Sequence, residues 1–145
     1  MIWTPRTTVA AVIEQDQQFL MVEERIGSAV KLNQPAGHLE DNESLIDAVI
    51  RETREETAWQ FKPEALVGIY RWRHGASQDT YIRFCFTGEL GEFLDTPLDP
   101  DITQAVWLDA DTMNTRAAQF RTPLVLQCWQ DYLAGKRHSL DLLNE

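Results

Sequence analysis

The sequence contains little cysteine and no long apolar run. Its 145 residues include only two cysteines, Cys85 and Cys128, which cannot supply a disulfide framework. Both lie among apolar residues, as buried free thiols usually do. No apolar run approaches the roughly 20 residues that span a membrane, and the N-terminus lacks the basic and apolar regions of a signal peptide. These absences predict a cytoplasmic protein that does not contact a membrane.

Basic residues are also scarce. There are 13 Lys and Arg against 23 Asp and Glu, which gives a net charge of −10. A chain this acidic lacks the basic footprint expected of a protein that binds a nucleic-acid polymer. If such a protein acts on a phosphate ester, it must offset charge repulsion locally, and bound divalent cations would do so. The length suits one domain covering residues 1–145.

Apolar runs and turn signals alternate along the chain in a pattern typical of an α/β domain. We predict strands at residues 7–14, 19–24, 65–73, 80–90 and 105–108, and loops at 25–31 and 91–100. We predict helices from Asp41 or Asn42 to about Thr57, from Asp109 or Asp111 for a short stretch, and from Pro123 to about Ala134. The tail from Leu140 onward carries no assignment. This order favours an α/β sandwich with a mixed β-sheet over a regular βαβ series.

A cluster of carboxylates marks the second half of the first predicted helix. At 100° per residue, Glu55, Glu52 and Glu56 fall at roughly 40°, 100° and 140° from Arg51, so they share one arc. Like charges at this spacing cost about 0.2–0.5 kcal/mol per pair on an exposed helix. Clustered oxygen ligands suit Mg²⁺, or alternatively Mn²⁺, and such ions take further ligands from phosphates. The alternative is a solvated acidic helix face held by intrahelical ion pairs.

The spacing around this cluster resembles a known family motif. Gly37 is followed after five residues by Glu43, and then after seven residues by Arg51-Glu52-Thr53-Arg54-Glu55-Glu56. Residues 37–59 thereby resemble the Nudix box of the Nudix hydrolases. Thr53 replaces the usual aliphatic residue of that motif and Ala58 replaces the usual glycine. Because alanine is unfavourable at positive φ, Ala58 argues against a left-handed cap at the helix end.

The resemblance implies a fold, an activity and a cofactor. It implies a single-domain α/β fold, the Nudix-type αβα sandwich, and a Mg²⁺-dependent hydrolase of phosphoanhydrides. Shorter motifs resemble the NudJ-type branch of phosphatases, and they are Asn33–Glu40, Ile82-Arg83-Phe84 and Ser139-Leu140. That branch acts on nucleoside di- and triphosphates and on the pyrophosphate of the thiamine pyrimidine precursor.

The resemblance also implies residue roles. Glu52, Glu55 and Glu56 are expected to bind the metal, together with the carbonyl of Gly37. Arg51 is expected to orient these carboxylates, with Glu43 as its ion-pair partner. Catalysis is assigned to Glu55, Glu52, Arg51 and Asp101. The general base is either a helix glutamate or a distant loop acid, for which we favour Asp101 over Asp99.

Three residues are candidates for substrate binding. Arg83 lies among aromatic residues on a predicted inner strand, where an arginine is costly unless it is paired or faces a pocket. It either contacts a phosphate or forms a structural ion pair. Trp72 could stack on a base or pyrimidine ring, or simply cover a sheet face. His38 could contact a phosphate, or it could have a structural role in the turn in which it lies.

Alternative functions remain open from the sequence alone. One is a pyrophosphatase acting on ADP-ribose or another nucleoside diphosphate derivative. A different class is a non-catalytic Nudix module that binds a nucleotide, although such modules usually lose the motif residues that are present in this sequence. Binding of RNA is a third class, and it lacks a basic stripe. The expected partner is a small phosphorylated substrate, and the protein is expected to be a monomer or a homodimer.

Overall fold

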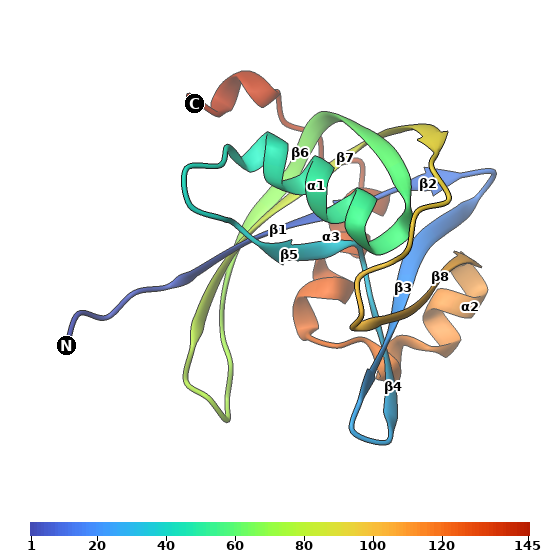
Figure 1. The fold of residues 1–145 in the computed structure, drawn as a ribbon, viewed down its shortest axis with the longest axis horizontal. Helices are drawn as coiled ribbons and strands as arrows, with labels where there is room; N and C mark the ends of the chain where they lie inside the picture. Colours follow the sequence, from blue (N-terminus) through green and yellow to red (C-terminus); the bar gives the residue numbers. More distant parts are fainter.

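The computed structural model describes residues 1–145. Figure 1 shows the helices and strands with their labels. The strands are β1 (Arg6–Val12), β2 (Glu14–Gln15), β3 (Gln18–Ile26), β4 (Ala29–Asn33), β5 (Ala36–His38), β6 (Trp59–Arg73), β7 (Thr80–Phe93) and β8 (Ile102–Asp109). The α-helices are α1 (Leu45–Thr57), α2 (Ala110–Thr115) and α3 (Pro123–Leu133), and short 3-10 turns cover Ala117–Gln119 and Leu140–Leu142.

The strands form two four-stranded sheets. The first has the order β5-β1-β7-β6, and it is mixed because β1 and β7 are parallel while the other pairs are antiparallel. In the second, β3 pairs with β2, β4 and β8. The predicted mixed sheet is therefore confirmed.

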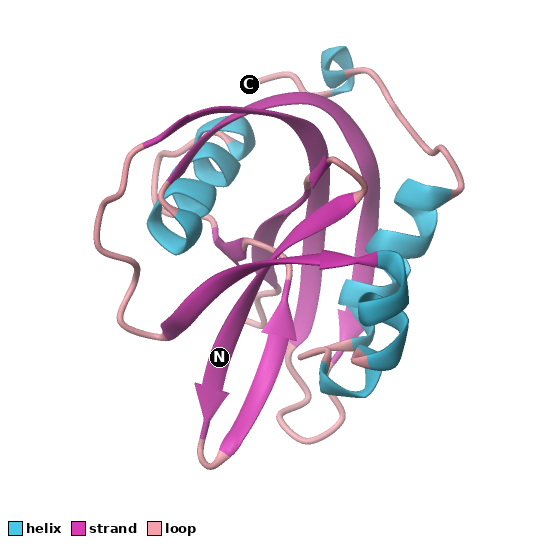
Figure 2. Cartoon of the chain, turned by 90° about the vertical axis from the view of Figure 1, so that its right-hand side faces the viewer, coloured by secondary structure: helices cyan, strands magenta, loops and turns pink.

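Helices cover both faces of the mixed sheet, as Figure 2 shows. On one face, Val9 of β1 and Phe86 of β7 pack with Val49 of α1 in one buried cluster. On the other face, Cys85 of β7 packs with Cys128 of α3 in a second cluster. Successive strand residues thus face opposite layers, as the pleat requires. This arrangement confirms the predicted αβα sandwich, and both cysteines are buried and free.

The predicted loop at residues 25–31 is wrong. Arg25 pairs with Val30 and Ile26 pairs with Ala29, so β3 and β4 form a hairpin closed by the turn at Gly27 and Ser28. Gly27 has a φ of 63°, which a glycine adopts without strain. The exposed tip of this hairpin has no apolar periodicity, and for that reason the sequence pattern did not reveal it.

The first helix begins later than predicted. Ser44 is the N-cap, since its side chain accepts a hydrogen bond from the Asp47 N–H at 3.0 Å. Asn42 instead lies in a left-handed turn with φ 58°. At the other end Ala58 adopts φ 64° and donates its N–H to the Arg54 carbonyl. The left-handed cap therefore forms, contrary to the expectation drawn from alanine.

Other boundaries are longer than predicted. The strands β6 and β7 extend to Trp59 and Phe93, and their ladder is irregular near Pro63. Asp109, one of the two predicted starts, caps α2, and α3 begins at Pro123 as predicted, with Thr122 as its cap. The tail returns to the body of the protein, where the backbone of His138 exchanges two hydrogen bonds of 2.8 Å with Leu66. None of the helices combines the length and the apolar character needed to span a membrane.

Candidate active site

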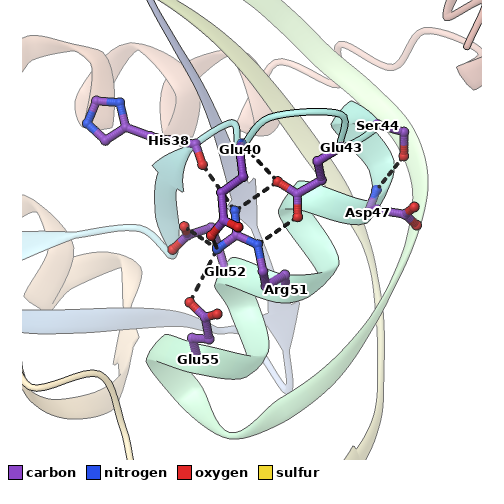
Figure 3. A network of polar contacts seen from close by, with 8 residues as sticks. All are labelled: His38, Glu40, Glu43, Ser44, Asp47, Arg51, Glu52 and Glu55. Atoms are coloured by element: carbon purple, nitrogen blue, oxygen red, sulfur yellow. Dashed lines mark hydrogen bonds and ion pairs between the residues drawn. The ribbon is translucent and has the colours of Figure 1, made fainter.

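Arg51 lies at the centre of a polar network on α1, which Figure 3 shows. Its Nε donates to Glu43 Oε2 at 2.6 Å and its Nη2 donates to Glu43 Oε1 at 2.9 Å. Its Nη1 donates to Glu52 at 2.7 Å and to Glu55 at 3.2 Å. Arg51 Nη2 also donates to the carbonyl of His38 at 3.1 Å. The predicted pairing of Arg51 with Glu43 is therefore present, and Arg51 ties the helix to the end of β5.

Glu52 lies directly against Gly37. A methyl group placed on Gly37 would lie 2.0 Å from Glu52 Cδ and 2.2 Å from one of its carboxylate oxygens. Real Cβ atoms do not approach other atoms so closely, so any side chain at this position would displace the carboxylate. Gly37 is thus required here for the close approach of strand β5 to α1.

Glu56 reaches the same strand from the next turn of α1. Its Oε1 accepts a hydrogen bond from the Ala36 N–H at 2.9 Å. Glu56 is 7% exposed and Glu52 is 8% exposed, whereas the Glu55 side chain is 38% exposed. The alternative of a solvated acidic face is therefore wrong for Glu52 and Glu56.

The environment makes the charged forms of these two carboxylates unfavourable. Burial raises the pKa of Glu56 to about 9, against a hydrogen bond from Ala36 that lowers it, and Glu52, Glu24 and Asp99 raise it further. Burial also raises the pKa of Glu52, although Arg51 opposes this shift. A cation bound among these groups would compensate the gathered negative charge.

The chemistry of the donor set fits a hard divalent cation. Glu52, Glu55, Glu56 and the Gly37 carbonyl offer only oxygen atoms, which Mg²⁺ and Mn²⁺ prefer. As the side chains stand, no group of three acidic, histidine or cysteine side chains converges on one point. Glu52 and Glu55 each turn one carboxylate oxygen toward Arg51.

The two loop acids differ in their position. The Asp99 N–H donates to the Glu55 carbonyl at 2.8 Å, which ties the loop before β8 to α1. The charge of Asp99 also contributes to the raised pKa of Glu52 and Glu56. Asp101 is exposed, and its side chain makes no hydrogen bond or ion pair in the structure.

Two buried polar residues near the site were missed by the sequence analysis. Glu24 on β3 is 5% exposed, pairs with Arg121 and raises the pKa of Glu56 by its charge. Gln34 is 2% exposed and holds Arg83 through a 3.3 Å hydrogen bond from Nη1 to Oε1. Glu24 ends an apolar strand, so the sequence pattern does not distinguish it from a surface residue. Gln34 precedes a proline, and nothing in the local sequence marks it as buried.

The proposed substrate residues lie on the face of the mixed sheet away from α1. His38 pairs with Thr8, and Thr8 pairs with Arg83, so the three residues form one row across β5, β1 and β7. Tyr81 lies between His38, at a ring distance of 6.4 Å, and Trp72, at 5.9 Å. The rings of Trp72 and His38 therefore both lie beside the ring of Tyr81.

The backbone carbonyl and the imidazole ring of His38 point in different directions. Figure 3 shows its carbonyl directed at Arg51 while the imidazole points away from the carboxylates. Burial lowers the pKa of His38, and the charges of Arg6, Arg121 and Arg83 lower it further. The imidazole thus lies in a cationic environment that opposes its protonation.

Known proteins resemble the chain over nearly its whole length. The NUDIX domain profile matches residues 4–128. The protein named "Phosphatase NudJ" from Escherichia coli strain K12 is 34% identical over 145 residues, covering 99% of this chain and 94% of the relative. The protein of the same name from Shigella boydii serotype 4 shows the same identity and coverage.

Solved structures support the same relationship. A NUDIX hydrolase from Nitrosomonas europaea is 51% identical with a TM-score of 0.95, and 98% of this chain and 97% of that chain are covered. The NUDIX domain of Shewanella oneidensis NrtR, solved with ADP ribose, has a TM-score of 0.74 at 16% identity, with 92% and 90% covered. The second likeness concerns the fold alone.

Proposed function

The chain belongs to the Nudix hydrolase family, and we propose that it is a Mg²⁺-dependent enzyme that releases phosphate from small substrates. It is a NudJ-like Nudix phosphohydrolase acting on small phosphorylated compounds. The proposed substrates are nucleoside di- and triphosphates, or the pyrophosphate of a small pyrimidine such as the thiamine precursor. The observation that supports this proposal best is the burial of Glu52 and Glu56 against β5 beside Arg51.

The metal would be held by the carboxylates of α1. Glu52, Glu55 and Glu56 would be its side-chain ligands, and the carbonyl of Gly37 would be the fourth donor. Mg²⁺, or Mn²⁺ in its place, would neutralise charge on the phosphoryl oxygens. Arg51 would hold Glu52 and Glu55 in position, since it already contacts both while its other donors are fixed by Glu43.

Hydrolysis requires a base that takes a proton from the water attacking phosphorus. Glu52 and Glu55 are candidates on α1. Among the loop acids, Asp101 remains the prediction from the sequence, but the contacts of Asp99 with α1 now favour Asp99. Asp99→Asn and Asp101→Asn, compared side by side, would identify the residue whose loss flattens the acid limb of the pH–rate profile.

The substrate would extend over the face of the mixed sheet that carries Arg83, Trp72 and His38. Arg83 would contact a phosphate, and Trp72 would offer a ring for stacking on a base or pyrimidine. His38 would contribute a hydrogen bond from its ring. The proximity of His38 and Trp72 to Tyr81 supports a common aromatic wall.

Two other functions remain as alternatives. A pyrophosphatase of ADP-ribose or another nucleoside diphosphate derivative would use the same metal ligands. A non-catalytic nucleotide-binding module has the same fold, but Arg51, Glu52, Glu55 and Glu56 are all present in this chain. A complete set of motif residues argues for catalysis.

A substrate screen would separate these functions. Purified protein with Mg²⁺ would be incubated with nucleoside di- and triphosphates, ADP-ribose and pyrimidine pyrophosphates, and orthophosphate and pyrophosphate would be measured separately. Orthophosphate release is the expected result. Pyrophosphate release from triphosphates would favour a pyrophosphatase, and no release across the panel would favour the binding module.

Three expectations about the setting of the protein remain predictions. A cytoplasmic location can be tested by fractionating cells and detecting the protein with an antibody. A monomer or homodimer can be distinguished by light scattering during gel filtration. A mobility shift with RNA at physiological salt would contradict the expected absence of a nucleic-acid partner.

A further inference from the structure

Arg121 lies beside the second sheet, at the edge formed by β4. Phe120 forms a parallel bridge with Leu32 of β4, and the Arg121 N–H donates to the Leu32 carbonyl at 2.8 Å. The Arg121 side chain crosses β4 and pairs with Glu24 on β3, whose own partner on β4 is Lys31. The backbone and the guanidinium of Arg121 are therefore both held by the sheet.

The ion pair of Arg121 and Glu24 lies on the face of the second sheet that is turned toward α1. Alternation along β3 places Glu24 on the same face as Leu20. Leu20 packs with Val49 of α1 in one buried cluster. The pair therefore faces the helix that carries the proposed metal ligands.

A chain of contacts joins this ion pair to α1. On β8, Ile102 is the partner of Glu24, and the Ile102 N–H donates to the Asp99 carbonyl at 2.9 Å. The Asp99 N–H in turn donates to the Glu55 carbonyl at 2.8 Å. One loop thus connects the ion pair with a proposed metal ligand.

Arg121 retains donors that Glu24 does not use. Its Nη1 donates to Glu24, and no other nitrogen of its side chain makes a hydrogen bond. The Arg121 side chain is 47% exposed, whereas that of Glu24 is 6% exposed. A guanidinium fixed in this way can present its remaining donors to a phosphate, whose oxygens match their planar arrangement. Because the side chain is already ordered, binding an anion costs less conformational entropy.

Arg116 offers a comparison on the opposite face of the same sheet. It pairs at 3.4 Å with Glu23, the residue that precedes Glu24 on β3 and faces the other way. Its Nε also donates to Gln119 at 2.6 Å. Two side chains of the protein therefore engage Arg116, whereas one engages Arg121.

We propose that Arg121, held in place by Glu24, binds a phosphoryl group of the substrate at the edge of the second sheet. The inference deepens the proposed function and rests on it. Arg121 is then a substrate-binding residue, and Glu24 is a positioning residue that acts through Arg121.

Kinetics with the most rapidly hydrolysed compound of the substrate screen test Arg121. Arg121→Lys keeps a cation opposite Glu24 but loses the remaining donors, and it is expected to raise KM roughly tenfold with a smaller change in kcat. The double variant Glu24→Gln with Arg121→Gln removes both charges together, so it leaves no buried carboxylate unpaired. It is expected to raise KM at least as much. Arg116→Lys is the matched control and should keep the KM of the wild type.

The positioning role of Glu24 is tested by combining variants. Glu24→Gln is expected to raise KM in the wild type, since Arg121 is then no longer held in one place. The same change is expected to add little to Arg121→Lys, because its effect depends on the donors that this variant has already lost. Equal effects of Glu24→Gln in the two backgrounds would contradict the positioning role.

Binding of inorganic phosphate provides a readout that needs no hydrolysis. Thermal unfolding would be followed in Mg²⁺ with phosphate, and with sodium chloride at matched ionic strength. Phosphate is expected to raise the Tm of the wild type and of Arg116→Lys more than chloride does. This increment is expected to be largely lost in Arg121→Lys and in the double variant.

The outcomes separate this inference from the proposed function. If a substrate is hydrolysed and Arg121→Lys and the double variant leave KM unchanged, the inference is wrong and the proposed function stands. If the phosphate increment depends on Arg121 but no substrate is hydrolysed, the anion site stands and the proposed function is wrong. If both variants lower the Tm without phosphate and keep the phosphate increment, the ion pair is structural and the inference is overturned.

Discussion

Arg51 and Glu43 form a two-pronged ion pair in which Nε and Nη2 donate to the two carboxylate oxygens at 2.6 and 2.9 Å. Glu43 precedes the helix while Arg51 lies in its second turn, so the pair anchors the loop to α1. The hydrogen bonds raise the pKa of Arg51 far above its usual value and lower that of Glu43. Arg51 is thereby fixed where it contacts Glu52 and Glu55.

Replacing Glu43 by Gln is expected to impair the site without unfolding the protein. The change keeps the shape but removes the charge that fixes Arg51, so Glu52 and Glu55 lose a rigid support. Loss of such outer contacts typically costs about 10- to 100-fold in metal affinity or activity. The Mg²⁺ dependence of kcat measures the effect, and exposed Glu92→Gln is the control. An unchanged Mg²⁺ midpoint and kcat would contradict a positioning role for the pair.

Glu55→Gln and Glu56→Gln test the metal assignment directly. Each variant loses a charged ligand or a base, and kcat is expected to fall by about 100-fold or more. Initial rates with saturating Mg²⁺ give the result, and circular dichroism verifies the fold. Glu89→Gln on the exposed side of β7 should retain full activity. Near-full activity in both helix variants would remove α1 from the proposed mechanism.

Gly37→Ala is expected to inactivate the enzyme while leaving it folded. The new methyl group would meet the Glu52 carboxylate, which lies at the end of a flexible side chain and can move away. The displacement moves a proposed ligand by more than 1 Å, a change that can cost about 100-fold in rate. Steady-state kinetics and thermal unfolding would be compared with those of Gly75→Ala, where no atom lies within 4 Å of the added methyl. A fully active Gly37→Ala enzyme would be incompatible with this geometry.

Glu145→Ala is expected to destabilise the start of α1. The Glu145 carboxylate accepts hydrogen bonds from the N–H groups of Leu45 and Ile46 at 2.9 and 3.2 Å. It thus acts as a second cap beside Ser44, and loss of such a cap costs about 1 kcal/mol. Urea denaturation would measure the free energy of unfolding, with exposed Glu64→Ala as the control. Equal stability of Glu145→Ala and the control would show that the tail does not support the helix.

Tyr70→Phe is expected to lower stability in a manner that depends on pH. Tyr70 donates to Asp131 Oδ2 at 2.7 Å. Burial raises the pKa of Asp131, but the bonds from Tyr70 and Lys136 outweigh burial and hold that pKa below its usual value. A lowered carboxyl pKa stabilises the fold above the unfolded value of about 3.9, and this contribution is lost as pH falls through the folded pKa.

The expected difference between wild type and Tyr70→Phe is about 1 kcal/mol at pH 7. It should shrink as the pH is lowered below about 4, where Asp131 of the unfolded chain takes up a proton, and vanish below the lowered pKa of Asp131 in the folded wild type. Urea denaturation at pH 7, 5 and 3 would measure the difference. Tyr81→Phe, which removes a hydroxyl that makes no hydrogen bond, is the control. A difference that stayed constant down to pH 3 would contradict the role assigned to Asp131.

Several features of the fold could be predicted from local patterns. Apolar runs and turn signals predicted α1 and β7 as a helix and a strand, and Asp109 was one of the two residues predicted to start α2. The hairpin of β3 and β4 was not recognised, because its tip is polar and pairing with another strand makes it extended. Ala58 misled the prediction, since the packing around this fully buried residue imposes a left-handed backbone that alanine alone disfavours.

The sequence by itself determined which residues share the acidic arc of α1, because helical periodicity alone places Glu52, Glu55 and Glu56 together. Only the tertiary structure decided how each of them is used. Glu56 meets Ala36 across 20 residues of chain, and Arg83 meets Gln34 across 49. Such contacts depend on the pairing of β5 and β7 with β1, which no local pattern specifies. The sequence alone therefore predicts the proposed metal ligands, whereas the contact of Arg83 with the neutral amide of Gln34 arises only on folding.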